Sequence, residues 1–265
     1  MASVITLTTD FGLSDGFVGA MKGVILSIAP TAVIVDICHD ISPHDILSAA
    51  LILEDACCFF PKDTIHLAIV DPGVGSERNA VAIRADRFTF VGPDNGLFDL
   101  VLGTERQRWE AVRLTNALYR HAPVSNTFHG RDIFAPAAAH LAAGIPFNTL
   151  GERVFELAHL NISQPVMIRN VLEAHVLRID RFGNLITDLK HEQYLQWIPA
   201  SAKIGIHVGG HIISELNRTF SDVPVHHPVA YFGSGGRLEI AVNQGYAAKD
   251  LEIGPGGKVI LTHGT

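Results

Sequence analysis

Residues 64–85 read TIHLAIVDPGVGSERNAVAIRA, and this stretch says most about the fold. TIHLAIVD (64–71) is an apolar run of strand length that ends in an aspartate, and AVAIRA (80–85) is a second such run. Nearly continuous apolar strands are typical of sheets that are buried on both faces. The stretch therefore predicts two buried strands joined by a glycine-containing loop.

The loop DPGVGSER (71–78) is a phosphate-binding loop, a turn closed by an ion pair, or half of a catalytic site. It is not a Walker loop, because no Gly-Lys-Ser/Thr follows. It also lacks the third glycine and the helix of a Rossmann fingerprint. Pro72 fixes φ, and Gly73 and Gly75 permit positive φ. Asp71 and Arg78 can pair across the loop, and the local sequence alone favours a structural salt bridge.

Strand and helix patterns alternate outward from this stretch through the first half of the chain. The other strand patterns are VITLTTD (4–10), AVIVDI (32–37) and FTFVG (88–92). Alternation of this kind implies right-handed crossovers, and hence an α/β domain with a mostly parallel sheet flanked by helices. Asp10, Asp36 and Asp71 each end such a strand. Three carboxylates can therefore meet in one crevice at the carboxyl ends of the strands, although each is also an ordinary turn residue.

Three helices are expected between and after these strands. Ser14 and Asp15 offer an N-cap for a helix that Pro30 ends. Ser42-Pro43-His44-Asp45 is expected to begin a second helix, which runs to about Phe60. Asp132 is expected to cap a last helix that Gly144 ends.

Short strand patterns separated by glycine and polar turns follow beyond about residue 165. They are VMIRN, HVLRID, NLITDL, AKIGIHV, RLEIAVN and KVILTH, with one helical pattern at HEQYLQWI. This succession is typical of a compact all-β module, a barrel or a sandwich. We therefore expect two domains, an α/β domain over 1–165 and a smaller all-β domain over 170–265, with the boundary near 160–172.

Composition limits the possible functions. The 265-residue chain is 48% hydrophobic and 18% charged, with a net charge of −7, which argues against nucleic acid or an anionic membrane as partner. No apolar run is long enough to span a membrane, and no signal peptide is visible. Cys38, Cys57 and Cys58 fit neither a disulfide framework nor a C-x-x-C motif, so a reduced, cytoplasmic compartment is expected.

Several histidines and turns can carry chemistry. His129 in FHGRDIF (128–134) lies just before a helix start, where a histidine can act in acid/base chemistry or be an ordinary surface or interface residue. His39, His44 and His66 have no recognised metal-ligand spacing, so no metal site is predicted. DRFGN (180–184) is a turn by composition, in which Phe182 can stack on a flat ring and Asn184 can read an amide-like edge.

Six motifs occur together in one order along the chain. They are TTDFG-x-x-D (8–15), VDPGVGSER (70–78), GPDNG (92–96), FHGRDIFAP (128–136), DRFGN (180–184) and SGGRLEIAVNQGYA (234–247). With this set the chain resembles the S-adenosylmethionine hydrolases, also called S-adenosylmethionine hydroxide adenosyltransferases. These enzymes are related to the fluorinating and chlorinating enzymes that act on the same substrate. The resemblance covers nearly the whole chain and both expected domains.

The resemblance implies an N-terminal α/β domain, a C-terminal β-barrel domain over 170–265, and a homotrimer with substrate sites at the subunit interfaces. It also implies that Asp71, Arg78 and His129 handle the attacking water. Asp10 falls where the family holds the ribose hydroxyls, and Asp15 where it grips the methionine amino group.

The resemblance adds further substrate-binding residues. Phe182 and Asn184 fall where the family binds adenine, and Asp180 and Ser234 fall near the methionine end. His44 stands where relatives usually place an aromatic ring against the sugar, and Gly235 where halogenating relatives carry an arginine. The expected substrate-binding set is completed by Phe128, Asn243 and Ala247, which belong to the same motifs.

The expected reaction is hydrolysis of S-adenosyl-L-methionine, a small-molecule substrate, to adenosine and L-methionine, without cofactor or metal. The sulfonium is already a good leaving group, so the chemical demand falls on the water, with either Asp71 or His129 as its base. The alternatives are a halide-dependent, chlorinase-like adenosyl transfer and a non-catalytic S-adenosylmethionine or adenosine sensor. A metal-dependent phosphohydrolase is the third.

Overall fold

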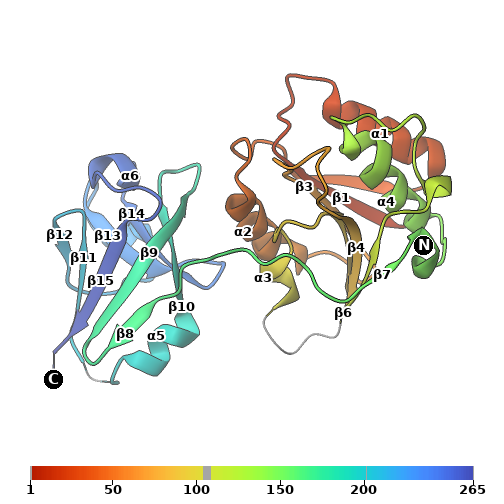
Figure 1. The fold of residues 1–265 in the computed structure, drawn as a ribbon. Helices are drawn as coiled ribbons and strands as arrows, with labels where there is room; N and C mark the ends of the chain where they lie inside the picture. The colour runs from red at the N-terminus through yellow and green to blue at the C-terminus, as the bar shows by residue number, and fades with distance from the viewer. Residues whose placement is uncertain (1, 104–108, 201, 265) are drawn as a thin grey trace. The chain divides into compact units, whose positions relative to one another are not determined.

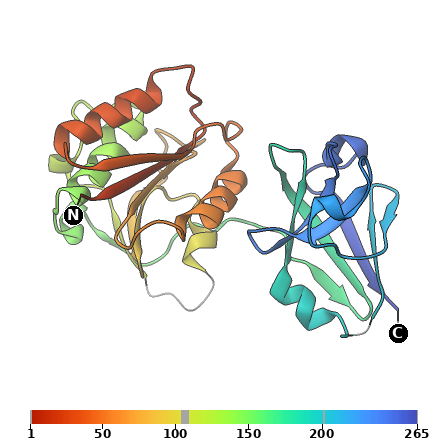
Figure 2. The ribbon, with the colours of Figure 1, turned by 180° about the vertical axis from the view of Figure 1, so that it is seen from behind.

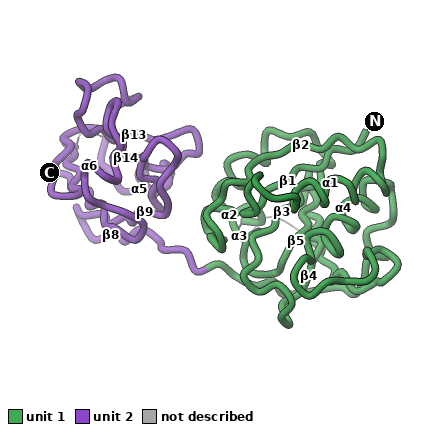
Figure 3. Tube along the Cα trace, turned by 90° about the horizontal axis from the view of Figure 1, so that it is seen from above, with its two compact units in different colours: residues 1–160 green, residues 161–265 purple. Residues whose placement is uncertain are grey.

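The computed structural model of the chain describes residues 2–103, 109–200 and 202–264. The chain divides into two compact units, residues 1–160 and 161–265, each with its own hydrophobic core (Figure 3). None of the helices in the described ranges combines the length and the apolar character that a membrane span requires.

The first unit is built on a seven-stranded sheet with the strand order β2-β1-β3-β5-β4-β6-β7. Its strands are β1 (Val4–Thr9), β2 (Val33–Cys38), β3 (Ile65–Ile69), β4 (Ala80–Ala85), β5 (Phe88–Pro93), β6 (Trp109–Arg113) and β7 (Arg153–Val154). The helices are α1 (Phe17–Ile28), α2 (Ile46–Cys57), α3 (Asp99–Leu102) and α4 (Ala135–Ala142), with shorter turns η1 (Ala117–Tyr119), η2 (Gly130–Phe134) and η3 (Phe147–Leu150).

Only part of this sheet is parallel. Strands β2, β1, β3 and β5 pair in parallel, whereas β4 pairs antiparallel with β5 and β6, and β6 pairs antiparallel with β7. The cause is local, because Asp86 and Arg87 alone join β4 to β5 and Ala85 lies opposite Phe88. A two-residue connection permits a hairpin but no crossover, so the prediction of a mostly parallel sheet is confirmed in part.

Helices cover both faces of the sheet (Figures 1 and 2). On one face, Met21 of α1 and the alanines of α4 pack on Ile5 and Leu7. On the other face, Leu53 of α2 and the α3 region pack on Ala68 and Val70 of the β3 region. The central strands β1 and β3 are therefore buried on both sides, whereas the edge strand β2 is not.

The helix starts differ from the sequence predictions. The N-cap of α1 is Gly16 without a side-chain hydrogen bond, so Ser14 and Asp15 do not cap this helix. The helix α2 begins at Ile46 and ends at Cys57, and Asp45 caps it by accepting a hydrogen bond from the Ser48 amide at 2.9 Å. A start at Ser42 is wrong because His44 has a φ of +69°, outside the helical region.

Asp132 is also not an N-cap. It lies inside the π-helix η2, where its buried carboxylate accepts hydrogen bonds from the Ser125 amide at 2.8 Å and from Arg131. The predicted end of α4 is confirmed. Gly144 has a φ of +89°, and hydrogen bonds from the amides of Gly144 and Ile145 close the helix as a Schellman motif.

The second unit is a curled antiparallel sheet with the order β12-β11-β15-β9-β10-β14-β13, and β8 pairs with β9. The strands β12 and β13 lie in contact, so the sheet is nearly closed. The expected all-β fold is confirmed, and the expected β-barrel is confirmed in part, as a barrel-like domain. The strands are β8 (Val166–Ile168), β9 (Val171–Ile179), β10 (Leu185–Lys190), β11 (Ile204–Val208), β12 (His211–Ile213), β13 (Pro228–Phe232), β14 (Arg237–Val242) and β15 (Lys258–His263). The helices are α5 (His191–Trp197), which the sequence predicted, α6 (Ala247–Asp250) and the turn η4 (Phe220–Asp222).

Candidate active site

Asp71 and Arg78 form a tight pair at the carboxyl end of β3. The Arg78 Nε lies 2.9 Å from Asp71 Oδ1 and 3.0 Å from Oδ2, and Arg78 Nη2 also donates to Oδ2. The side chain of Asp71 is only 5% exposed and that of Arg78 only 11%. Charge-assisted hydrogen bonds so far removed from water are stronger than those of a surface ion pair.

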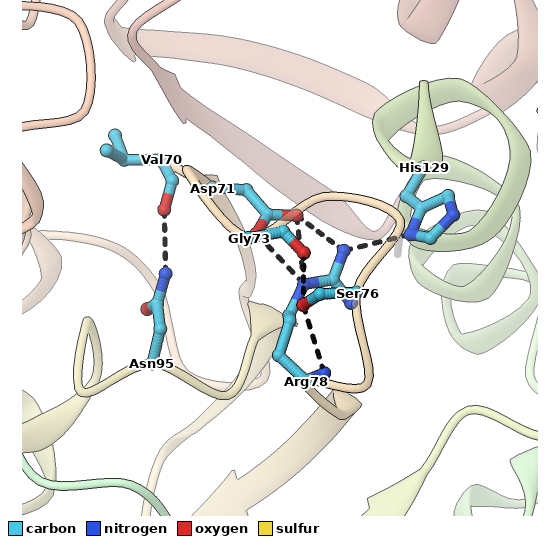
Figure 4. Close-up of polar contacts among 7 residues, drawn as sticks. All are labelled: Val70, Asp71, Gly73, Ser76, Arg78, Asn95 and His129. Atoms are coloured by element: carbon cyan, nitrogen blue, oxygen red, sulfur yellow. Dashed lines mark hydrogen bonds and ion pairs between the residues drawn. The ribbon is translucent and has the colours of Figure 1, made fainter. Parts of the chain in front are cut away.

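His129 completes a three-residue cluster, because its Nδ1 lies 2.9 Å from Arg78 Nη2 (Figure 4). A guanidinium only donates, so we assign Nδ1 as the acceptor and place the imidazole proton on Nε2. Burial lowers the pKa of His129, and the charge of Arg78 lowers it further against an opposing effect of Asp71. The imidazole is therefore neutral at neutral pH, and its lone pair is occupied by Arg78.

The turn that follows His129 fixes this geometry. His129 immediately precedes the π-helix η2, an element that is frequent at functional sites. The Arg78 guanidinium carbon lies 5.2 Å from the centroid of the Phe134 ring in the same turn. At Gly130 a Cβ would lie 3.2 Å from the Met21 sulfur and 3.2 Å from the Phe128 ring, so this turn packs closely against α1.

The loop that carries Arg78 is held at both ends. Ser76 donates to the Gly73 carbonyl through its amide at 3.0 Å and through its hydroxyl at 2.7 Å. Gly75 has a φ of +78°, and a Cβ there would lie 2.5 Å from the Asn126 carbonyl oxygen. The side-chain Nδ2 of Asn95 donates to the Val70 carbonyl at 2.9 Å (Figure 4). The loop 71–78 thus packs closely against Asn126, in the chain that leads to His129.

Asp10 lies at the same edge of the sheet. Thr9 and Ile69 are register partners, so Asp10 and Asp71 follow the ends of neighbouring strands. The Asp10 Oδ2 accepts a hydrogen bond from the His44 amide at 2.9 Å.

The third strand-end aspartate does not join them. Asp36 lies within β2 opposite Leu7, and its carboxylate accepts a hydrogen bond from Lys22 Nζ at 2.6 Å. The predicted convergence of three carboxylates is therefore wrong for Asp36, because its strand continues to Cys38 and its side chain is paired with α1.

Asp15, His44 and Phe128 have different surroundings. Asp15 and the side chain of His44 are exposed, in the chain before α1 and before α2 respectively. Phe128 is partly buried and packs edge-on against Phe11 and Phe17, with ring centroids 6.1 Å and 5.2 Å apart. This aromatic cluster lies one residue from His129.

In the second unit the hairpin DRFGN joins β9 to β10. The Asp180 Oδ1 accepts hydrogen bonds from the amides of Phe182 and Asn184, both at 2.9 Å, and Oδ2 accepts from the Asn184 side chain at 3.0 Å. Phe182 at the tip is 76% exposed. Gly183 has a φ of +88°, and a Cβ there would lie 2.4 Å from the Tyr246 ring.

The last motif lies at both ends of β14. Asn243 follows β14 and donates to the Val223 carbonyl at 2.7 Å, and buried Ala247 begins α6. Because Leu185 pairs with Ile240, this end of β14 lies beside DRFGN, and the Ala248 amide donates to the Gly183 carbonyl at 3.0 Å. Ser234 is exposed in the turn before β14, at the opposite end of the strand.

Sequence reasoning did not predict three residues that contact the candidate site. Asn95 anchors the end of β3, Phe134 lies under Arg78, and His39 contacts Thr9 beside Asp10. The motifs GPDNG and FHGRDIF contain the first two, but no local pattern says where their side chains point.

Among the described residues, no three His, Cys, Asp or Glu side chains gather as a metal site would require.

Fold and site together describe a two-domain α/β protein with polar groups at the carboxyl ends of its parallel strands, where such sheets bind small molecules. Residues 5–151 match the model of the SAM hydroxide adenosyltransferase N-terminal domain, and residues 174–260 match that of the C-terminal domain. The chain belongs to the SAM hydroxide adenosyltransferase family.

Its relatives carry related names. A protein of Thermus thermophilus named "(R)-S-adenosyl-L-methionine hydrolase" is 43% identical over 263 residues, covering 96% of this chain and 97% of the relative. One of Salinispora arenicola with the same name is 37% identical over 98% of both chains. A fluorinase of Actinoplanes sp. is 28% identical over 98% of this chain and 97% of its own. The crystal structure of an uncharacterized conserved protein from Thermotoga maritima superposes with a TM-score of 0.89 at 33% identity, covering 97% of this chain and 99% of the other.

Proposed function

We propose that this protein hydrolyses S-adenosyl-L-methionine to adenosine and L-methionine by attack of water or hydroxide at ribose C5′. The observation that carries the proposal is the partly buried cluster of Asp71, Arg78 and His129 in a chain of this family. The oxygen of water forms a bond to C5′ while the bond between C5′ and sulfur breaks. The electron pair of that bond leaves with the methionine thioether.

The sulfonium leaves as a neutral thioether, so the reaction needs no acid at sulfur. Water is a poor nucleophile, and a group that takes or shares its proton accelerates the attack by about 10²–10⁴-fold. We propose Asp71 for this role, because Arg78 already occupies the Nδ1 lone pair of His129. Arg78 then orients the carboxylate and stabilises developing hydroxide, and the proton passes from Asp71 to solvent.

The binding roles follow the family resemblance. We propose that Asp10 grips the ribose diol, that Asp15 binds the methionine amino group, and that exposed Phe182 stacks on adenine. The remaining proposed contacts are His44, Phe128, Asn184, Ser234, Asn243 and Ala247. Both carboxylate oxygens of Asp180 accept hydrogen bonds within the hairpin, so we propose that Asp180 acts by holding Asn184 in place.

The reaction as written needs no electron sink and no Lewis acid, so we propose that it proceeds without cofactor or metal. Purified protein incubated with S-adenosylmethionine should release adenosine and methionine in equal amounts by chromatography. A strong chelator should leave the rate unchanged. Loss of activity with the chelator that added metal restores would contradict metal independence.

The fluorinase relatives make halide the second candidate nucleophile. Adding chloride or fluoride to the same assay separates the two reactions, since halide attack gives a 5′-halogenated deoxyadenosine. We expect adenosine alone. Tight binding of substrate without any product would instead identify a sensor.

We further propose a homotrimer with substrate sites at the subunit interfaces, as the family resemblance implies. Light scattering coupled to size exclusion should then give three times the chain mass. A cytoplasmic location stays a prediction that rests on cysteine usage. Cys38, Cys57 and Cys58 are all free thiols, and burial raises the pKa of Cys57 to about 11, as expected for an inert apolar residue.

A further inference from the structure

A buried histidine that the proposed reaction does not use lies beside Asp10. His39 is 4% exposed, and its Nδ1 lies 2.8 Å from the hydroxyl of Thr9, which is fully buried. On the other side of the ring, Nε2 lies 3.1 Å from Asp36 Oδ1. Asp36 Oδ2 in turn accepts a hydrogen bond from Lys22 at 2.6 Å. The result is a continuous line from ammonium to carboxylate, imidazole and hydroxyl that ends one residue before Asp10.

The Asp36 carboxylate is the charged centre of this line. Burial favours a neutral Asp36, but its interactions with Lys22 and His39 outweigh burial and lower the pKa of Asp36. His39 Nε2 lies in ion-pair contact with this carboxylate, outside hydrogen-bond geometry, whereas Nδ1 and the Thr9 hydroxyl share a hydrogen bond whose donor is set by the ring tautomer. The Thr9 oxygen then accepts the Phe11 amide at 3.3 Å.

His39 also contacts the chain on the far side of Asp10. Its carbonyl accepts a hydrogen bond from the Gly12 amide at 2.8 Å. The chain that follows His39 then returns to Asp10, because the His44 amide donates to the Asp10 carboxylate. His39 thus contacts segment 9–12 on both sides of Asp10, at Thr9 and at Gly12. The chain that follows His39 holds the Asp10 carboxylate itself, through the His44 amide.

We propose that His39 is a positioning residue, which fixes the Asp10 carboxylate for recognition of the ribose hydroxyls, with Asp36 and Lys22 fixing the imidazole. The proposal rests on the proposed function, in which Asp10 binds the diol. A carboxylate that must meet two hydroxyl groups at once depends on orientation, and a displacement of about 1 Å is enough to lose such a contact.

The test compares two histidine variants. His39→Phe keeps a ring of similar size and removes both ring nitrogens. His66→Phe is the matched control, because it removes an equally buried imidazole whose Nδ1 lies 2.8 Å from the Thr6 hydroxyl, three residues earlier on the same strand. Calorimetry gives the Kd of adenosine and of 2′-deoxyadenosine for each folded variant. Chromatography gives kcat and KM for S-adenosylmethionine.

We expect the unmodified chain to bind adenosine more tightly than 2′-deoxyadenosine. His39→Phe should reduce the ratio of these two Kd values about tenfold. For S-adenosylmethionine, the same variant should raise KM and leave kcat nearly unchanged. His66→Phe should keep the preference even if it unfolds more easily. In an Asp10→Ala background, His39→Phe should narrow it no further, because both residues act through one contact.

Three results would overturn the inference. They are an unchanged preference in His39→Phe, equal narrowing in both histidine variants, and an unmodified chain that binds neither nucleoside. An unmodified chain that prefers adenosine but releases no methionine would refute the proposed hydrolysis instead, and the binding preferences would still decide the role of His39.

Discussion

At the scale of single residues, the candidate active site combines one ion pair with one neutral ring. The Asp71 carboxylate is held by Arg78, while His129 accepts a hydrogen bond from the same guanidinium. The sequence predicted the three residue types and the contact between Asp71 and Arg78. It left the base undecided, because tautomer and direction of hydrogen bonding depend on how loop 71–78 is seated against residues 125–129.

Asp71→Asn tests the proposed base. Asparagine keeps the shape and one acceptor for Arg78 but cannot take a proton, so we expect kcat to fall by about 10²–10⁴-fold with KM changed only a few-fold. Glu77→Gln, an exposed carboxylate in the same loop, is the control and should behave like the unmodified chain. Equal losses in kcat and in substrate affinity would make Asp71 a binding residue.

The second prediction at this scale concerns pH and the buried imidazole of His66. Burial lowers the pKa of His66 from its usual 6.5 to about 4. Between these values the unfolded chain binds the proton and the folded chain does not, so stability falls as the pH drops from about 6.5 to about 4. The full effect is about 3 kcal/mol at most.

Urea unfolding of the unmodified chain and of His66→Phe, at about pH 7 and about pH 4.5, checks this. Carboxylates and other histidines contribute equally to both proteins, so the difference between them isolates His66. The unmodified chain should lose more stability on acidification. The same loss in both proteins would show that His66 is not the group responsible.

At the scale of elements, the sequence predicted most strands and helices but not their ends or pairing. The apolar runs of β1, β2 and β3 are strong signals. The β4–β5 pair was predicted as two strands, and its antiparallel direction could have been read from the two-residue link at Asp86 and Arg87. Helix starts are harder, because Ser42 and Asp45 are both good caps and only the backbone at His44 decides between them.

Asp45→Ala tests the observed cap of α2. Losing the hydrogen bond to the Ser48 amide should lower the free energy of unfolding by about 1 kcal/mol. It should also raise KM, because the neighbouring His44 amide holds Asp10. Ser42→Ala, at the cap that the sequence favours, should change stability little. A larger loss from Ser42→Ala than from Asp45→Ala would contradict the observed helix start.

At the scale of the whole molecule, the two halves of the sequence have different patterns, and they form two units of different architecture. The first half alternates strands and helices, and the second is a succession of short strands. The all-β character of the second half was readable from its short strands and turns. Its near closure was not, because the contact between β12 and β13 joins segments with no pattern of their own. The proposed site residues are shared between the units, with Asp10 and Asp71 in the first and Phe182 and Asn184 in the second.

The central claim is that water attacks ribose C5′. It is tested most directly by running the reaction in ¹⁸O-labelled water and weighing both products by mass spectrometry. Attack by water predicts adenosine that carries one labelled oxygen at its 5′-hydroxyl and methionine that carries none. Unlabelled adenosine would contradict attack by water, and a 5′-halogenated product would show that halide is the nucleophile.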